Sequence, residues 1–333
     1  MKYLVLIISG LIVLTGATAV FVFFLMAPEA PKVYKIGILQ FADAPVPKTI
    51  IENVLKNLKK QGFSEDNLLI LYPESPASDS AKAGALVDYF LQEKVDVILA
   101  TNSIGAKIVF EKVKETPVVF TAVAKPLPLG IAESYISSGN NFTGVEFAVP
   151  LSKTLELIKS GFPAFKKIGV LYSQTEPSPV LYEELKTAGP DFGFQVISRQ
   201  TTANDFEAAV NYFAAQNADF IYLLPDPTLV PYIKQLKQSA DRHGLPIVGN
   251  TIDGEYLMSL VADTKEMGFL AADLIIKILN GNKPSSLSIQ MPQKFNLTLN
   301  QADADLKKII FPEWLSHIAD RIITKEGVKE TVR

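Results

Sequence analysis

The segment Tyr34-Lys35-Ile36-Gly37-Ile38-Leu39-Gln40, YKIGILQ in one-letter code, returns further along the chain as KKIGVLY at residues 166–172. Both runs are short and apolar, and each comes before a stretch that favours a helix. This combination is typical of a buried strand followed by a helix. Because the pattern begins twice, the sequence predicts two successive units of the same architecture.

Strands and helices alternate through both predicted units. The first unit has expected strands at 34–40, 68–72, 95–100 and 118–123, and expected helices at 50–58, 78–93 and 103–114. The second has expected strands at 166–172, 194–198, 220–224, 246–249 and 257–261, and expected helices at 180–188, 204–216 and 229–243. The predicted fold class is therefore α/β, with two doubly wound lobes that each hold a parallel sheet covered on both faces.

Length and composition agree with two globular lobes. The chain has 333 residues, more than one hydrophobic core usually holds, and 48% of them are hydrophobic. The net charge is −3 without a basic stripe, which argues against a nucleic-acid partner. Cysteine is absent, so thiolate nucleophiles, disulfides and cysteine-metal sites are excluded.

The N-terminal segment differs from the rest of the chain. Tyr3 to Met26 carries no charge and is long enough to span a bilayer. Ala17-Thr18-Ala19 could be a signal-cleavage site, but the apolar run continues beyond it. We expect residues 1–32 to form a retained membrane anchor and spacer, with cleavage and secretion as the first alternative and a buried core helix as the second. Lys2 on the short side places the body outside the cytoplasm, on the periplasmic or extracellular face of the cell membrane.

Catalytic motifs are missing from the sequence. The two histidines, His243 and His317, stand at a predicted helix end and in an amphipathic stretch, where structural roles are expected. No HExxH, GxSxG, GxxxxGK[ST] or GxGxxG motif occurs, and nothing selects two carboxylates as a glycosidase pair. The sequence indicates a binding protein without a cofactor or metal, and not an enzyme.

Ligands of open parallel sheets bind at the carboxyl ends of the strands. In the first unit these ends offer the candidate ligand-binding residues Phe41, Thr101, Asn102, Ser103 and Thr121. The hydroxyls and amide that open the helix at Ser103 suit a carboxylate, but they are also preferred helix caps. Phe41 is equally well explained as a core residue.

The strand ends of the second unit supply further candidates, namely Tyr172, Ser173, Glu176, Asp226, Thr228, Asn250 and Asp253. Asp226 or Asp253 could receive the amine of a ligand. The alternative is that both aspartates cap the helix or turn that follows.

Several stretches, taken together in their order along the chain, resemble the ABC-transporter substrate-binding protein family of the type I periplasmic-binding fold. The resemblance is to the branch that includes tryptophan- and tyrosine-binding members, and it runs from about residue 34 to 300. The stretches are KIGILQF, ATNSIGA, TPVVFTAVAKPLPLGI, NFTGVEF, LELIKSGFPAFKKIGVLYSQTE, FIYLLPDPTLV, LPIVGNTIDG and MGFLAADLIIKILNGNKP.

The resemblance implies a multi-strand hinge, with a chain that crosses three times between the lobes. A helix at 264–280 would return to the first lobe, and a strand at 295–300 would cross back. The expected N-terminal lobe is 33–143 plus about 264–284, and the C-terminal lobe is 144–263 plus about 285–325. Implied partners are a small molecule in the inter-lobe cleft and an ABC permease and ATPase complex, with a monomeric body.

This sequence departs from the family pattern at several places. It has no lipobox cysteine, and Ala-Val-Ala-Lys-Pro at 122–126 stands where Ala-Val-Thr-Asp-Pro is expected. Asp226-Pro227-Thr228 replaces the usual Asp-Asn-Thr, and Asp43-Ala44-Pro45 replaces a loop built around His-Pro. If Lys125 faces the cleft, an anionic ligand is favoured; if it faces solvent, its charge is screened.

The function predicted from these observations is delivery of a small solute, an amino acid or a small organic acid, to an ABC permease. The alternative is a ligand-sensing ectodomain that signals to a membrane partner. A transcription repressor of the related two-lobed fold would need a helix-turn-helix before the first lobe, where the apolar segment stands instead.

Overall fold

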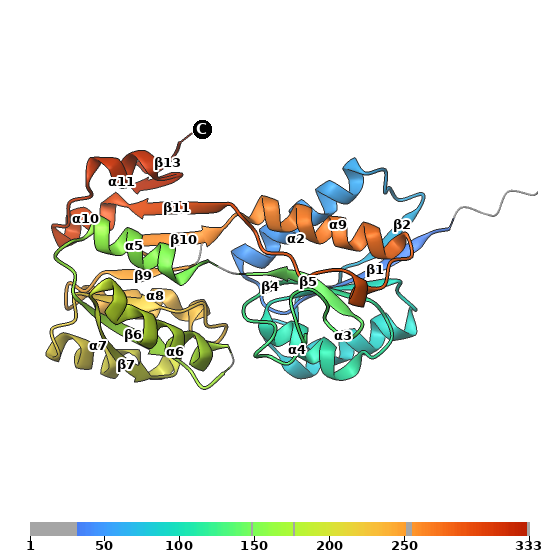
Figure 1. Ribbon diagram of the computed structural model, residues 1–333, viewed down its shortest axis with the longest axis horizontal. Coiled ribbons are helices and arrows are strands. Elements are labelled where there is room, and N and C mark those ends of the chain that lie inside the picture. The colour runs from blue at the N-terminus through green and yellow to red at the C-terminus, as the bar shows by residue number, and fades with distance from the viewer. Residues whose placement is uncertain (1–31, 148, 176, 251–254, 332–333) are drawn as a thin grey trace, which may run out of the picture.

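Two separate sheets organise the chain, and they lie side by side along the long axis of the molecule (Figure 1). The computed structural model describes residues 32–147, 149–175, 177–250 and 255–331. Glu176 and Asp253 lie outside the described residues, as does the predicted anchor up to residue 31. Within the described part of the chain, no helix is long and apolar enough to cross a membrane.

The first sheet has the strand order β2-β1-β3-β4-β5, and all its strand pairs are parallel. Its strands are β1 (Tyr34–Gln40), β2 (Leu68–Leu71), β3 (Val97–Thr101), β4 (Val118–Val123) and β5 (Phe142–Glu146). The helices packed on it are α2 (Pro45–Lys60), α3 (Ser80–Gln92), α4 (Ser103–Lys112) and α9 (Thr264–Leu279). The order reverses at β1, as in a doubly wound fold.

The second sheet repeats this arrangement and then extends it, in the order β13-β12-β11-β10-β9-β8-β6-β7. Its parallel part consists of β6 (Lys167–Tyr172), β7 (Gln195–Gln200), β8 (Phe220–Leu223), β9 (Ile247–Gly249) and β10 (Met258–Ala262). The extension consists of β11 (Phe295–Asn300), which is antiparallel to β10, β12 (Arg321–Thr324) and β13 (Gly327–Glu330).

The remaining helices belong to this second half. They are α5 (Leu151–Gly161), α6 (Ser178–Ala188), α7 (Phe206–Ala215), α8 (Ile233–Asp241), α10 (Gln301–Lys307) and α11 (Glu313–Ile318). Short 3-10 turns occur at η1 (Gly189–Phe192), η2 (Ala203–Asp205), η3 (Val230–Tyr232) and η4 (Pro284–Ser286). The predicted alternation of strands and helices is confirmed, whereas β5, α5, α10, α11, β12 and β13 were not predicted as elements.

The repeated Lys-Ile-Gly motif has the same packing role in both sheets. A Cβ atom on Gly37 of β1 would lie 2.7 Å from the ring of Phe90, and one on Gly169 of β6 would lie 2.8 Å from the ring of Phe213. Each phenylalanine comes from the second helix of its unit, α3 or α7. Only glycine leaves room for a ring directly on the central strand, so the motif marks where that helix docks.

Helix α9 packs against α2 although the strands before and after it belong to the second sheet (Figure 1). At Gly268 the two helices approach so closely that a Cβ atom would lie 2.5 Å from the Cβ atom of Asn53 and 3.0 Å from the carbonyl oxygen of Ile50. The chain therefore crosses from the second sheet to α9 and back again. A further crossing joins β5 to α5 (Figure 1).

Hydrogen bonds tie the crossing segments to one another. The Asp263 carboxylate caps α9 by accepting from the Glu266 backbone N–H at 2.7 Å. The Glu266 carboxylate in turn accepts from the backbone N–H groups of Gln293 and Lys294 at 2.9 and 2.8 Å. The chain entering α9 and the chain leaving it are thus held side by side.

We predict opposite effects for alanine at two helical glycines. Gly268→Ala should lower the free energy of unfolding by about 1–3 kcal/mol, because the new methyl group meets the backbone of α2, which cannot move aside. Gly84→Ala in α3 should leave stability unchanged or raise it, because the nearest atoms to its Cβ are the end of the Lys112 side chain at 3.8 and 3.9 Å. Chemical denaturation of both variants measures this, and a Gly268 variant as stable as the Gly84 variant would contradict the close contact.

Candidate functional site

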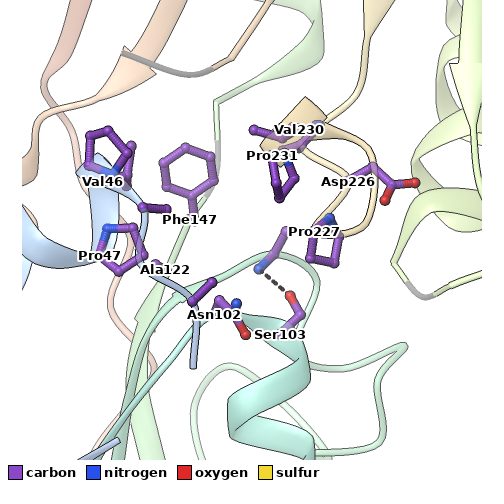
Figure 2. A pocket seen from close by; sticks show the side chains of 15 residues that line it. Val46, Pro47, Asn102, Ser103, Ala122, Phe147, Asp226, Pro227, Val230 and Pro231 are labelled. Atoms are coloured by element: carbon purple, nitrogen blue, oxygen red, sulfur yellow. Dashed lines mark hydrogen bonds between the residues drawn. The ribbon is translucent and has the colours of Figure 1, made fainter. Parts of the chain in front are cut away.

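A cavity of about 140 Å³ lies between the two sheets, at the carboxyl ends of their strands (Figure 2). We call it the first cavity. Residues after β1, β3, β4 and β5 line one side, and residues after β8 line the other. They are Ala42, Ala44, Pro45, Val46, Pro47, Asn102, Ser103, Ala122, Ala124, Phe147, Pro225, Asp226, Pro227, Val230 and Pro231. This is the place where ligands of doubly wound sheets bind.

The walls of the first cavity are mainly apolar. Among the described residues, five of those that line it are prolines. Figure 2 shows Phe147 between Val46 on one side and Val230 and Pro231 on the other. Since proline has no backbone N–H and a fixed φ, this wall is stiff and offers few hydrogen-bond donors. The cavity is suited to the apolar part of a small solute.

The polar groups of the first cavity stand at the start of α4, as the sequence predicted for Asn102 and Ser103. Asn102 Oδ1 accepts a hydrogen bond from the Gly105 backbone N–H at 2.8 Å and so caps the helix. Ser103 Oγ accepts from the backbone N–H of Ala124 at 3.3 Å, which ties α4 to the loop after β4 (Figure 2). The capping interpretation therefore holds for Asn102 but not for Ser103, and both residues line the cavity.

The backbone around the cavity adopts unusual conformations. Asn102, Ala122 and Lys125 have φ angles of 59°, 54° and 55°, in the region that favours glycine. The pairing of β4 with β5 also changes register between Phe120 and Val123. Such local strain and irregular pairing are typical of functional sites, where they direct side chains toward a ligand.

Asp226 is fully buried, and its carboxylate is already occupied by hydrogen bonds. Within the described chain it accepts from the backbone N–H groups of Ser173, Thr228 and Leu229 at 3.0, 2.8 and 3.1 Å, and from the Thr228 hydroxyl at 2.7 Å. Figure 2 shows the carboxylate pointing away from the cavity. This geometry favours the turn-capping alternative, and a role in binding an amine stays a prediction.

Four other predicted residues lie in or just after strands, in the interior of the lobes or against a helix. The Thr101 hydroxyl donates to the Leu39 carbonyl at 3.2 Å, and Phe41 belongs to the core beneath α3 and α4. Thr121 is fully buried, and its hydroxyl has no hydrogen-bond partner among the described residues. Tyr172 stacks on Tyr182 with ring centroids 4.3 Å apart.

The remaining predicted residues line other hollows. Ser173 and Thr228 line a hollow of about 470 Å³ within the second lobe. Asn250 lines a second cavity of about 240 Å³, which adjoins the first because Ala124, Phe147 and Pro225 line both. The Asn250 amide is engaged, since it accepts from the Tyr222 hydroxyl at 2.7 Å and donates to the Leu260 carbonyl at 2.8 Å.

Lys125 faces the second cavity, where it pairs across the lobes. Its Nζ atom lies 2.8 Å from Oε1 of Glu184, which belongs to α6. Both side chains are partly exposed, so the pair contributes little to stability by itself. Of the two orientations considered from the sequence, Lys125 takes the one that faces the cleft, and there its charge is paired with Glu184 and not free for an anionic ligand.

Glu146, at the end of β5, is the buried acid of the second cavity. Burial raises the pKa of its carboxyl group, and the negative charge of Glu184 raises this pKa further. A hydrogen bond from Tyr135, the backbone N–H of Lys125 and the charge of Lys125 lower it. The Lys125 N–H donates to Oε1 at 3.2 Å. Burial and the proximity of Glu146 likewise raise the pKa of Tyr135.

The comparisons with known proteins match this architecture. The sequence model of the family described as ABC transporter substrate binding protein matches residues 35–323. The chain belongs to this family. A tyrosine-binding protein of Clostridioides difficile (strain R20291) is 23% identical over 279 residues, covering 82% of this chain and 80% of the relative.

Two solved structures show that this family member is similar to known proteins in its fold as well as in its sequence. One is the ABC domain from Streptococcus pneumonia in complex with L-Trp, with 24% identity, a TM-score of 0.82, and coverage of 88% of this chain and 100% of that one. The other is a conserved domain protein from Vibrio cholerae, with 28% identity, a TM-score of 0.81, and coverage of 87% and 100%. The type I periplasmic-binding fold is thereby shown.

Sequence reasoning missed several residues of this substrate-binding protein's cavities, Glu146 and Phe147 above all. Both lie just after the boundary between the predicted lobes, which the sequence placed between residues 143 and 144. Their signal was available, since Glu146 ends a strand and Phe147 follows it, as Asn102 follows β3. In the proline-rich segment at 225–231, only Asp226 and Thr228 were predicted to bind a ligand, and the prolines were not.

We predict that Asn102→Ala lowers the free energy of unfolding by about 0.5–2 kcal/mol, because the cap of α4 is lost. Asn102→Gly also removes the cap, but glycine adopts a φ near 59° without strain, so this variant should be more stable than the alanine one. Thermal unfolding of both variants tests the prediction. An alanine variant as stable as the wild type, or more stable than the glycine variant, would refute it.

Proposed function

We propose that the chain is an extracytoplasmic solute-binding protein that holds a small molecule between its lobes and passes it to an ABC permease and ATPase complex. The observation that carries the proposal is the first cavity, which is lined from strand ends of both lobes. A solute held there contacts both lobes at once, so binding favours their closed arrangement. The activity proposed is binding without chemical conversion.

The proposed lobes are residues 33–143 with about 264–284, and 144–263 with about 285–325, each boundary lying a few residues before the chain leaves the first sheet at Glu146 and at Gln290. The crossing segments between them would serve as the hinge. The hydrogen bonds between the Glu266 carboxylate and residues 293–294 keep two of these segments together, which supports rotation about them as a unit. The closed arrangement presents a joint surface of both lobes to the permease.

The proposed solute is an amino acid or a small organic acid with an apolar side group. The proline and phenylalanine walls of the first cavity favour such a group. The start of α4, with Asn102 and Ser103, favours a carboxylate. The relative named as a tyrosine-binding protein and the structure solved with L-Trp point in the same direction.

We predict that a screen of amino acids and small organic acids against the full chain in mild detergent finds compounds that raise its melting temperature, since a ligand bound only by the folded state stabilises it. Phe147→Ala should lower the affinity for the tightest-binding compound about 10- to 150-fold, which corresponds to the loss of about 1.5–3 kcal/mol of buried apolar contact. Phe269→Ala, on an exposed face of α9, is the control and should bind normally. If no compound shifts the melting temperature, solute binding is contradicted.

We also propose that residues 1–32 anchor the body to the outer face of the cell membrane. The support is the uncharged run from Tyr3 to Met26, which has the length of a bilayer span. Expressed with its native N-terminus, the protein should sediment with membranes at full length, and deletion of residues 1–32 should release a monomeric body. Recovery of a shortened, unsedimented species beginning near Val20 or Ala27 would instead indicate cleavage.

A further inference from the structure

The second cavity holds a buried carboxylate that lacks a full set of partners. Glu146 is 2% exposed, and only its Oε1 atom accepts a hydrogen bond of normal length, from the Lys125 backbone N–H at 3.2 Å. Oε2 has no partner of normal hydrogen-bond geometry among the described residues, although the Tyr135 hydroxyl is close enough to the same carboxylate to lower its pKa as a hydrogen-bond donor. A buried carboxylate oxygen without a partner carries a desolvation cost, which a bound cation would offset.

The one lysine among the described lining residues of the second cavity is already used. Lys125 Nζ lies 2.8 Å from Glu184, so its ammonium group is paired with that acid and acts on Glu146 only through its charge. Two further donors of the lining are committed elsewhere, since Asn250 donates to the Leu260 carbonyl and the Tyr222 hydroxyl to Asn250, and the Tyr135 hydroxyl is the remaining side-chain donor toward Glu146. Two acids and one lysine leave the described lining with a surplus negative charge.

The two cavities are parts of one inter-lobe space, because Ala124, Phe147 and Pro225 line both of them. Glu146 and Phe147 are neighbours in the sequence, at the point where β5 ends and the chain leaves the first lobe. A solute whose apolar group contacts Phe147 in the first cavity can therefore extend a polar group into the second.

We propose that Glu146 accepts an ammonium group of the solute in the second cavity, so that the solute is an amine-bearing compound such as an amino acid and not a simple organic acid. The inference rests on the proposed solute binding and names the chemical group of the solute that lies in the second cavity. It assigns the amine to Glu146 in place of Asp226, whose carboxylate is fully engaged within its own lobe. The Lys125–Glu184 pair then keeps the lysine from competing for Glu146.

The test uses pairs of probes that differ only in the amino group: L-tryptophan with indole-3-propionate, L-tyrosine with 3-(4-hydroxyphenyl)propionate, and L-leucine with 4-methylpentanoate. Calorimetric titration of the full chain in mild detergent measures each affinity. Within whichever pair it binds, the wild-type protein should bind the amine more tightly than the deaminated probe. Glu146→Gln should lower the affinity for that amine about 10- to 150-fold, the effect of losing a charge-assisted hydrogen bond, and leave the affinity for its deaminated partner unchanged.

Glu183→Gln is the matched control, because this glutamate precedes Glu184 on α6 but pairs with Lys186 outside the second cavity. It should keep the wild-type preference. Without a probe, Glu146→Gln should melt at the wild-type temperature or above it, since it removes a buried charge. A normal melting curve with lost preference therefore separates a binding role from a folding defect.

Wild-type protein supplies a readout that needs no variant. Acidification protonates Glu146, whose pKa is raised, so the affinity for the amine should fall relative to its deaminated partner. The other titratable groups that line the cavity are Lys125, Tyr135, Glu184 and Tyr222. Of these, only Glu184 could end the preference for an amine by gaining a proton at acidic pH. Replacing Glu184 alone would free Lys125 to pair with Glu146, so the control is the double variant Lys125→Met/Glu184→Gln, which should keep the pH dependence.

The outcomes separate this inference from the proposed function. If no probe of either kind binds, solute binding itself fails, and the inference fails with it. If deaminated probes bind as tightly as their amines, the inference alone is overturned and the protein remains a binder of organic acids. If Glu146→Gln keeps the full preference, the inference alone is likewise overturned, and a group other than Glu146 binds the amine.

Discussion

The packing of α9 against α2 is the constraint on which the rest of the structure depends. Gly268 lets the two helix backbones approach until no side chain fits between them, and this commits α9 to the first sheet. The strands before and after it pair with each other in the second sheet. One helix contact therefore forces two crossings of the chain.

The crossings explain why the cavities lie where they do. Strand β5 ends in Glu146 and Phe147 immediately before the first crossing, so both side chains stand between the lobes. Backbone hydrogen bonds join Glu146 and Gly144 to Gln290 on the returning segment, at 2.9 and 2.8 Å. The groups that face a solute are thus attached to the segments about which the lobes would turn, which couples occupancy of the cavity to the position of the lobes.

Most of the fold could be predicted from the sequence, because its signals are local. The glycine in YKIGILQ and in KKIGVLY admits a phenylalanine ring from a helix of the same unit. The site depends on contacts between distant segments. Asn102 was found because a polar residue after a strand is visible in sequence. The engagement of Asp226 by Ser173 was not visible, since the two are 53 residues apart. Glu146 was missed because the stretch at 142–146 was not predicted as a strand, so no strand end pointed to this residue.

The prolines around the first cavity have a consequence for how selective the protein is. A wall of pyrrolidine rings loses little conformational entropy when it is covered, so a modest contact area still yields useful affinity. The same wall selects a solute by its shape rather than by its pattern of polar atoms, because it offers few hydrogen-bonding groups. Solutes of similar shape should therefore compete for it, and discrimination among them rests with the few charged groups at its margin.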